Sequence, residues 1–128
     1  MRKAILAGIA AIAMVAAAPA VPHHSTANFD FTKTATVTGT VQYFSFTNPH
    51  SFIDLTVLDD GGVAHAYKFF TVARVVMMRT GWAVGDIKPG DKVTITGNPD
   101  RRNPEFLYLS KVTFAGGKVW DHDPALAR

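Results

Sequence analysis

The sequence predicts an all-β domain with one short helix, in the order of three strands, a helix and two strands. Three observations predict it. Five segments between residues 34 and 114 are rich in β-branched and aromatic residues and are separated by Gly, Pro, Asn and Asp turns. Apolar residues recur at helical spacing in one short stretch, residues 71–80. No internal repeat or long linker interrupts the pattern, so one domain accounts for it.

The first predicted strand, residues 34–46, changes face along its length. The residues Val37, Gly39, Val41 and Tyr43 share one face, and the apolar set then moves to Phe44 and Phe46. Because successive side chains of a strand point to opposite faces, this switch predicts a β-bulge or a sharp bend. Asn48-Pro49 follows as a turn, with the proline fixing φ at its second position.

The next two strands are predicted to form a hairpin. Residues 51–58 place Ile53, Leu55 and Val57 inward, and Asp59-Asp60-Gly61-Gly62 supplies the connection. In residues 63–70 the inward face carries Val63, His65, Tyr67 and Phe69. We interpret His65 as a satisfied interior or rim residue rather than as a metal ligand.

A short helix and two further strands complete the pattern. Thr71 is predicted to cap a helix that runs to about Thr80, with Val72, Val76 and Met77 on one side, and Gly81 is expected to stop it. The turn Pro89-Gly90-Asp91 leads into a fourth strand over residues 92–97. A fifth strand is predicted over residues 105–114, with a small hairpin to Trp120 and a flexible tail over 121–128.

This order of elements is that of an OB-type barrel, a five-stranded Greek-key sheet with a helix at one end. We therefore expect an OB-like barrel over residues 34–120, preceded by a polar N-terminal arm over residues 21–33. An antiparallel barrel or sandwich of another topology is the alternative.

The first twenty residues have the three parts of a secretory signal peptide. Arg2 and Lys3 form a positive start, residues 4–18 are almost entirely apolar, and Ala18-Pro19-Ala20 is a small-residue cleavage signature. Cleavage is expected after Ala20, which predicts a periplasmic or secreted protein. The apolar run is rich in alanine and shorter than the about 20 residues of a spanning helix, so no stable membrane span is expected after cleavage.

Composition narrows the classes of function. Cleavage of the leader would remove Arg2 and Lys3, which lowers the number of basic residues from 13 to 11, against 10 acidic residues. This near balance argues against a nucleic-acid partner. The chain has no cysteine, which excludes disulfides, thiolate metal sites and cysteine nucleophiles.

Short motifs are spread over nearly all of the chain after the leader. They are His23-His24-Ser25 and Phe29-Asp30, then Thr38-Gly39-Thr40-Val41, Asn48-Pro49-His50-Ser51, Arg79 to Trp82, and Pro89 to Val93. With this spacing the chain resembles a family of small exported bacterial proteins classed only as a domain of unknown function. The resemblance implies no established activity. Two positions depart from it: Val21-Pro22 precedes the histidine pair, and Phe70 stands where relatives tend to carry an acidic residue.

Three histidines form the candidate metal site. His23 and His24 lie on the predicted arm, and His50 lies in the turn between the first two strands, on the barrel rim that OB folds use for ligands. Neutral imidazole is a common ligand of Cu²⁺ and Zn²⁺. The leading hypothesis is therefore an exported binding or accessory protein that holds a transition metal, copper before zinc. A docking or processing role for the histidine pair is the alternative explanation of the motif.

A second hypothesis is a metal-free module that binds a protein, peptide or glycan through an aromatic rim. The aromatic residues Tyr43, Phe44, Phe46, Phe52, Phe69 and Phe70, with Arg101 and Arg102, are its candidate surface. This hypothesis requires that Tyr43, Phe44 or Phe46 be exposed in a contiguous apolar patch.

Catalysis is the weakest hypothesis, and we expect no enzyme. Ser25, His24 and Asp30 are the residue types of a catalytic triad, but an arm lacks the fixed geometry that such catalysis requires. The sequence has no phosphate-binding glycine loop. A hydrolase would need a concave pocket with His50 and a carboxylate within hydrogen-bond distance.

Overall fold

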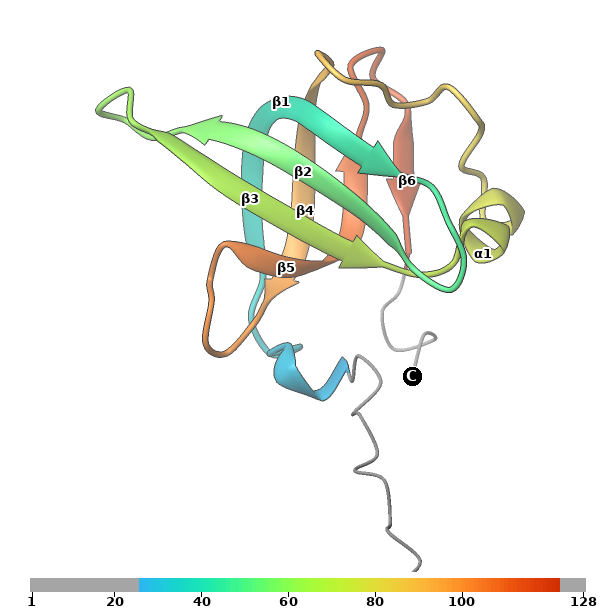
Figure 1. The fold of residues 1–128 in the computed structure, drawn as a ribbon, viewed down its shortest axis with the longest axis horizontal. Coiled ribbons are helices and arrows are strands. Elements are labelled where there is room, and N and C mark those ends of the chain that lie inside the picture. Colours follow the sequence, from blue (N-terminus) through green and yellow to red (C-terminus); the bar gives the residue numbers. More distant parts are fainter. Residues whose placement is uncertain (1–25, 123–128) are drawn as a thin grey trace, which may run out of the picture.

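The computed structural model describes residues 26–122, and their five-stranded barrel confirms the predicted fold class (Figure 1). The elements follow in the order η1 (Thr26–Asn28), β1 (Ala35–Ser45), β2 (Ser51–Leu58), β3 (Ala64–Thr71), α1 (Arg74–Arg79), β4 (Lys92–Pro99), β5 (Phe106–Thr113) and β6 (Val119–Asp121). β2 spans the predicted residues, and the other four barrel strands differ from prediction by one or two residues at their ends.

The barrel closes through one parallel pairing. The strands lie in the order β3-β2-β1-β4-β5-β6, with neighbours antiparallel. β3 also pairs with β5 in parallel, from Lys68 opposite Phe106 to Phe70 opposite Tyr108. This pairing joins the two ends of the sheet, while β6 extends β5 as a short hairpin (Figure 1).

β1 bends as its sequence predicts, and it serves two neighbours. Its first half pairs with β4 and its second half with β2, and the register against β2 shifts between Val41 and Tyr43. Val41 is buried, Tyr43 is 57% exposed, and Phe44 packs against the core. The predicted bulge is confirmed, but the prediction that Tyr43 shares a face with Val41 is wrong, because the register shift lies between them.

Two glycines allow the strands to approach closely. A Cβ atom on Gly39 would lie 2.6 Å from the Thr56 carbonyl oxygen, and one on Gly97 would lie 2.7 Å from that of Tyr108. Gly97 also sits at the register shift between β4 and β5. A side chain at either position would displace the neighbouring backbone, which explains the glycine in the Thr38 to Val41 motif.

Buried side chains form two groups. The main core cluster comprises Val41, Ile53, Leu55, Phe69, Met77, Trp82, Ile87, Val93, Ile95, Leu107, Leu109, Val112, Phe114 and Trp120. A smaller group, which we call the aromatic cluster, comprises Phe29, Phe70 and Tyr108, with Phe31, Phe52, Val72 and Phe106 packed against it. Val63 was expected to face inward but is 58% exposed, because it precedes β3.

The helix is shorter than predicted and has a different cap. Thr71 ends β3 and is fully buried, and the N-cap residue is Ala73, which has no side chain able to accept a hydrogen bond. The predicted Thr71 cap is therefore wrong: cross-strand pairing with Ser51 takes Thr71 into the sheet. Gly81 follows the helix with φ +106°, so its predicted role as the stop is confirmed.

The part of the predicted arm that the structure describes is docked on the barrel. Phe29 forms a β-bridge with Asp100 and is buried in the aromatic cluster. Asp30 accepts hydrogen bonds from the Thr32 N–H (3.1 Å) and hydroxyl (2.6 Å), and its carboxylate lies 3.6 Å from the Arg101 guanidinium. The predicted leader lies outside the described residues.

The C-terminal boundary differs from prediction by two residues. Asp121 belongs to β6 and pairs with Lys111. His122 is buried, and its ring stacks on Trp120 with centroids 5.4 Å apart. The barrel domain therefore extends to residue 122. None of the helices between residues 26 and 122 has the length and apolar content that crossing a bilayer requires.

Candidate functional site

The β1–β2 connection, residues 46–50, is called the rim loop here, and its own side chains hold it in shape. The Thr47 hydroxyl donates to the His50 carbonyl at 2.8 Å, and the Ser51 hydroxyl donates to the Thr47 carbonyl at 3.2 Å. Short hydroxyl side chains often bond nearby backbone in this way and fix turns. The rim loop is thus an ordered platform.

The rim loop also supplies the missing cap of α1. The Arg74 N–H donates to the Thr47 carbonyl at 3.0 Å, and the Val75 N–H donates to Asn48 Oδ1 at 3.4 Å. Helix N-termini need such acceptors for their first N–H groups. Because Ala73 cannot provide one, loop and helix are held together as one unit at this end of the barrel (Figure 1).

His50 is the one candidate metal ligand that the described residues contain. It is half-buried at the end of the rim loop, and its ring centroid lies 4.5 Å from that of Phe70. Its Nδ1 atom is buried and forms no hydrogen bond within residues 26–122. Buried polar atoms are usually hydrogen-bonded, and an imidazole nitrogen is also a common metal ligand.

His23 and His24 lie outside the described residues, but Phe29, which follows them in the chain, lies close to His50. Phe29 stacks on Phe70 with centroids 5.9 Å apart and an interplanar angle of 19°, so Phe29 and His50 contact the same ring. His24 lies five positions before Phe29, which corresponds to a reach of roughly 17 Å at full extension. Between residues 26 and 122, no group of three His, Asp or Glu side chains is placed to hold a metal ion.

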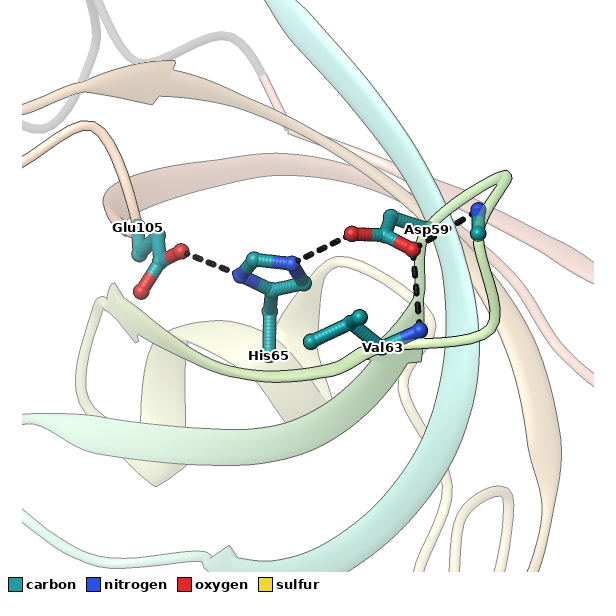
Figure 2. A network of polar contacts seen from close by, with 5 residues as sticks. Asp59, Val63, His65 and Glu105 are labelled. Atoms are coloured by element: carbon teal, nitrogen blue, oxygen red, sulfur yellow. Dashed lines mark hydrogen bonds and ion pairs between the residues drawn. The ribbon is translucent and has the colours of Figure 1, made fainter.

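His65 lies at the centre of a polar clip that joins two loops. Its Nε2 atom lies 2.9 Å from Asp59 Oδ2, in the β2–β3 connection, and its Nδ1 atom lies 3.0 Å from Glu105 Oε1, just before β5 (Figure 2). Asp59 Oδ1 also accepts the N–H groups of Gly61 and Val63 at 2.9 Å. The carboxylates occupy opposite edges of the imidazole ring, so they cannot converge with it on one metal ion.

The contacts of the clip shift the pKa values of His65 and Asp59 in the directions that favour the ion pair between them. Hydrogen bonds to Asp59 and then Glu105 raise the pKa of His65 above its ordinary 6.5. The hydrogen bond from His65 and those from the Val63 and Gly61 N–H groups lower the pKa of Asp59 below its ordinary 3.8. An imidazolium with both nitrogens bonded to carboxylates is a structural link rather than a proton acceptor.

The clip is expected to make stability depend on pH. The contribution of His65 is full below pH 6.5 and is lost as pH rises through its raised pKa, and that of Asp59 is lost as pH falls through its lowered pKa. An NMR titration of the His65 ring should give a midpoint above 6.5. Asp59→Asn should lower that midpoint more than Glu105→Gln, because Asp59 is the larger cause. A midpoint at or below 6.5 would contradict the clip.

A groove opens between the rim loop and the exposed face of α1. It encloses about 440 Å³ and is lined by Asn48, Arg74, Val75, Met78 and Arg79. The helix is amphipathic: Met77 is buried in the main core cluster, while Val75 and Met78 are 43% and 47% exposed. Volumes between roughly 300 and 1,000 Å³ are typical of ligand sites.

Ring stacking links one wall of the groove to the core. The Arg74 guanidinium lies 5.1 Å from the centroid of the Phe46 ring. Phe46 stacks on Phe44 at 5.3 Å, and Phe44 stacks on the buried Trp82 at 5.5 Å. Arg74 is thereby held by a cation–π contact on a rigid support.

The predicted aromatic surface is divided by the fold. Phe69 and Phe70 are buried, Phe44 and Phe46 are half-buried, and Tyr43 is exposed. Of the two arginines assigned to that surface, Arg101 pairs with Asp30. The groove residues of α1 were not predicted as a site. The sequence did contain a signal for this site. On the helix face opposite Val76 and Met77, the apolar residues Val75 and Met78 lie between two arginines.

The residues proposed for a hydrolase are not brought together in the described part of the chain. His24 and Ser25 lie outside it, and the Asp30 carboxylate is engaged by Thr32, Lys33 and Arg101. No carboxylate between residues 26 and 122 lies within hydrogen-bond distance of His50.

Known proteins support the fold and the family. The chain is similar in structure to the mitochondrial single-stranded DNA binding protein Rim1 of S. cerevisiae, with a TM-score of 0.50, 8% sequence identity, and coverage of 71% of this chain and 96% of that chain. Identity this low shows a shared OB fold alone. No curated protein matches the chain in sequence. A family model matches residues 11–106, and the chain therefore belongs to the family of unknown function DUF6152.

Proposed function

We propose that the chain is exported and acts as an OB-like binding module that takes a segment of a protein partner into the groove between the rim loop and α1. The observation that carries this proposal is the groove itself, because it combines exposed apolar side chains with polar and cationic ones at its edges. Sites of that composition gain affinity from apolar contact and orientation from the polar groups.

A nucleic-acid partner fits the described surface less well. Rim1 is a single-stranded DNA binding protein, and such proteins combine a positive groove with exposed stacking aromatics. Here Phe69 and Phe70 are buried. Without the leader, the chain has 11 basic and 10 acidic residues, so its net charge is close to zero. A protein segment does not need exposed aromatic side chains on which bases can stack, so it is the partner that these residues favour.

Selection of peptides tests the groove. A phage library of short random peptides is panned against the exported chain, and the affinities of the selected peptides are measured for two variants. Val75→Asn should weaken binding at least about tenfold, because it removes an apolar contact worth 1.4 kcal/mol or more. Val84→Asn is the matched control, since Val84 is 69% exposed and does not line the groove. Equal effects of the two variants, or no effect of either, would refute the proposal.

A transition metal at His50 is the second candidate function, and the unpartnered Nδ1 atom favours it. His50 would supply one ligand, and His23 or His24, carried by the segment that Phe29 anchors on the same ring, would supply others. Copper is preferred to zinc because imidazole sites generally bind Cu²⁺ more tightly. Calorimetric titration of Cu²⁺ and Zn²⁺ into the exported chain and its histidine variants tests this candidate.

A further inference from the structure

We infer that the groove binds an extended acidic segment, in which an apolar side chain sits on Val75 and Met78 and a carboxylate on each side of it pairs with Arg74 and Arg79. This inference rests on the proposed function of the groove, because it specifies the chemistry of the segment that binds there. Three observations support it: the two arginines have no acidic partner within residues 26–122, they flank an apolar pair on the helix, and the Phe46 ring holds Arg74 in place.

Within residues 26–122, the two groove arginines have no acidic partner, whereas five other cations of the barrel do. Lys33, Lys68, Lys88, Arg101 and Lys118 each lie within 4 Å of a carboxylate. Within residues 26–122, neither Arg74 nor Arg79 forms such a pair, and no acidic residue lines the groove. The groove is therefore a positively charged site that the barrel itself leaves unneutralised.

Helix geometry places the arginines on either side of an apolar pair. Arg79 lies five positions after Arg74, which corresponds to about 7.5 Å along the helix axis and about 140° around it. Val75 and Met78 lie between them on the same face. A ligand that satisfies all four must therefore present charge, apolar surface and charge in that order.

An extended peptide presents groups in this order at alternate residues. In a strand, residues i, i+2 and i+4 point to one side and span about 13 Å. Two long arginine side chains that diverge from neighbouring helix turns can reach carboxylates with this spacing. Acidic residues at i and i+4 with an apolar residue at i+2 fit the groove, whereas two adjacent acidic residues would point to opposite sides.

Arg74 is already held in place for a carboxylate. Its guanidinium lies over the Phe46 ring. This contact covers one face of the planar guanidinium and leaves the N–H groups at the guanidinium edge available for a carboxylate. The stack continues through Phe44 to Trp82, so the contact does not depend on the exposed surface alone. Phe46 is thus a positioning residue for Arg74, and less side-chain entropy is lost when a carboxylate binds.

The test uses a fluorescent synthetic peptide with leucine at its centre and glutamate two positions away on each side. Binding to the exported chain is followed by anisotropy. Changing either glutamate to glutamine should weaken binding about tenfold, the scale of one charge-assisted contact. Arg74→Gln and Arg79→Gln should each have a similar effect, and each should abolish the response to one particular glutamate in a double-mutant cycle. Phe46→Leu should reproduce part of the Arg74→Gln effect.

Lys111→Gln is the matched control, because Lys111 is exposed, lacks a carboxylate partner among residues 26–122, and lies outside the groove. It should leave binding unchanged. Equal affinity for the glutamate and glutamine peptides, or no binding of either, overturns the inference. If Val75→Asn still weakens the phage-selected peptides, the proposed function survives that result. Displacement of the glutamate peptide by a single-stranded thymidine oligonucleotide at lower concentration than by unlabelled peptide also overturns it, in favour of a phosphate ligand.

Discussion

Replacing Phe29 with alanine is expected to lower the free energy of unfolding by about 3–5 kcal/mol, the range found when buried phenylalanines are truncated. Phe29 is 4% exposed, and its ring lies between 5.2 and 5.9 Å from those of Phe70, Phe106 and Tyr108. Truncation leaves a cavity among these rings and removes the side-chain anchor of the segment before β1. For a domain of this size Tm should fall by at least about 12 °C.

Urea unfolding followed by tryptophan fluorescence measures this effect, since Trp82 and Trp120 belong to the main core cluster. Phe31→Ala is the matched control: Phe31 is only half-buried and packs on the edge of the same cluster, so its loss should be clearly smaller. A Phe29→Ala loss below about 1 kcal/mol would show that the segment is not anchored by this ring.

Removal of the His50 imidazole is expected to lower Cu²⁺ affinity at least about tenfold, which is the lower end of what loss of even an outer-shell partner produces. A double His23→Ala, His24→Ala variant should lose at least as much, because it removes the other proposed ligands. Phe29→Ala should also weaken binding, since the arm would no longer be held beside His50. Calorimetry at neutral pH measures all three.

The control for this series is His122→Ala, because His122 packs on Trp120 in the C-terminal hairpin rather than at the rim loop. It should leave metal affinity unchanged. Tight binding that survives both the His50 and the double variant would place any metal elsewhere, and absence of binding by the parent chain would remove the metal candidate.

Much of the fold could be predicted from local patterns. The alternation of residues 51–58 predicted β2 with its observed bounds. The change of face after Tyr43 predicted the bend in β1, which the structure places between Val41 and Tyr43. Gly81 was correctly identified as the helix stop. In each case the signal lies in a few consecutive residues, so neighbouring elements did not need to be known.

The incorrect predictions concern positions where a distant segment competes for the same residue. Thr71 has the chemistry of a cap, but pairing with Ser51 draws it into β3, and Asn48 and Thr47 cap the helix from another loop. Similarly, nothing local to His65 shows that carboxylates from two separate loops meet at its ring.

The sequence by itself determined the barrel, its bend and the position of its helix, because strand alternation, turn residues and helix stops act over a few residues. Only the tertiary structure decided that Phe29 and His50 share the Phe70 ring, and that the rim loop meets α1 around Arg74 and Arg79. Those juxtapositions depend on barrel closure between β3 and β5, a pairing of residues nearly forty positions apart that no local pattern records.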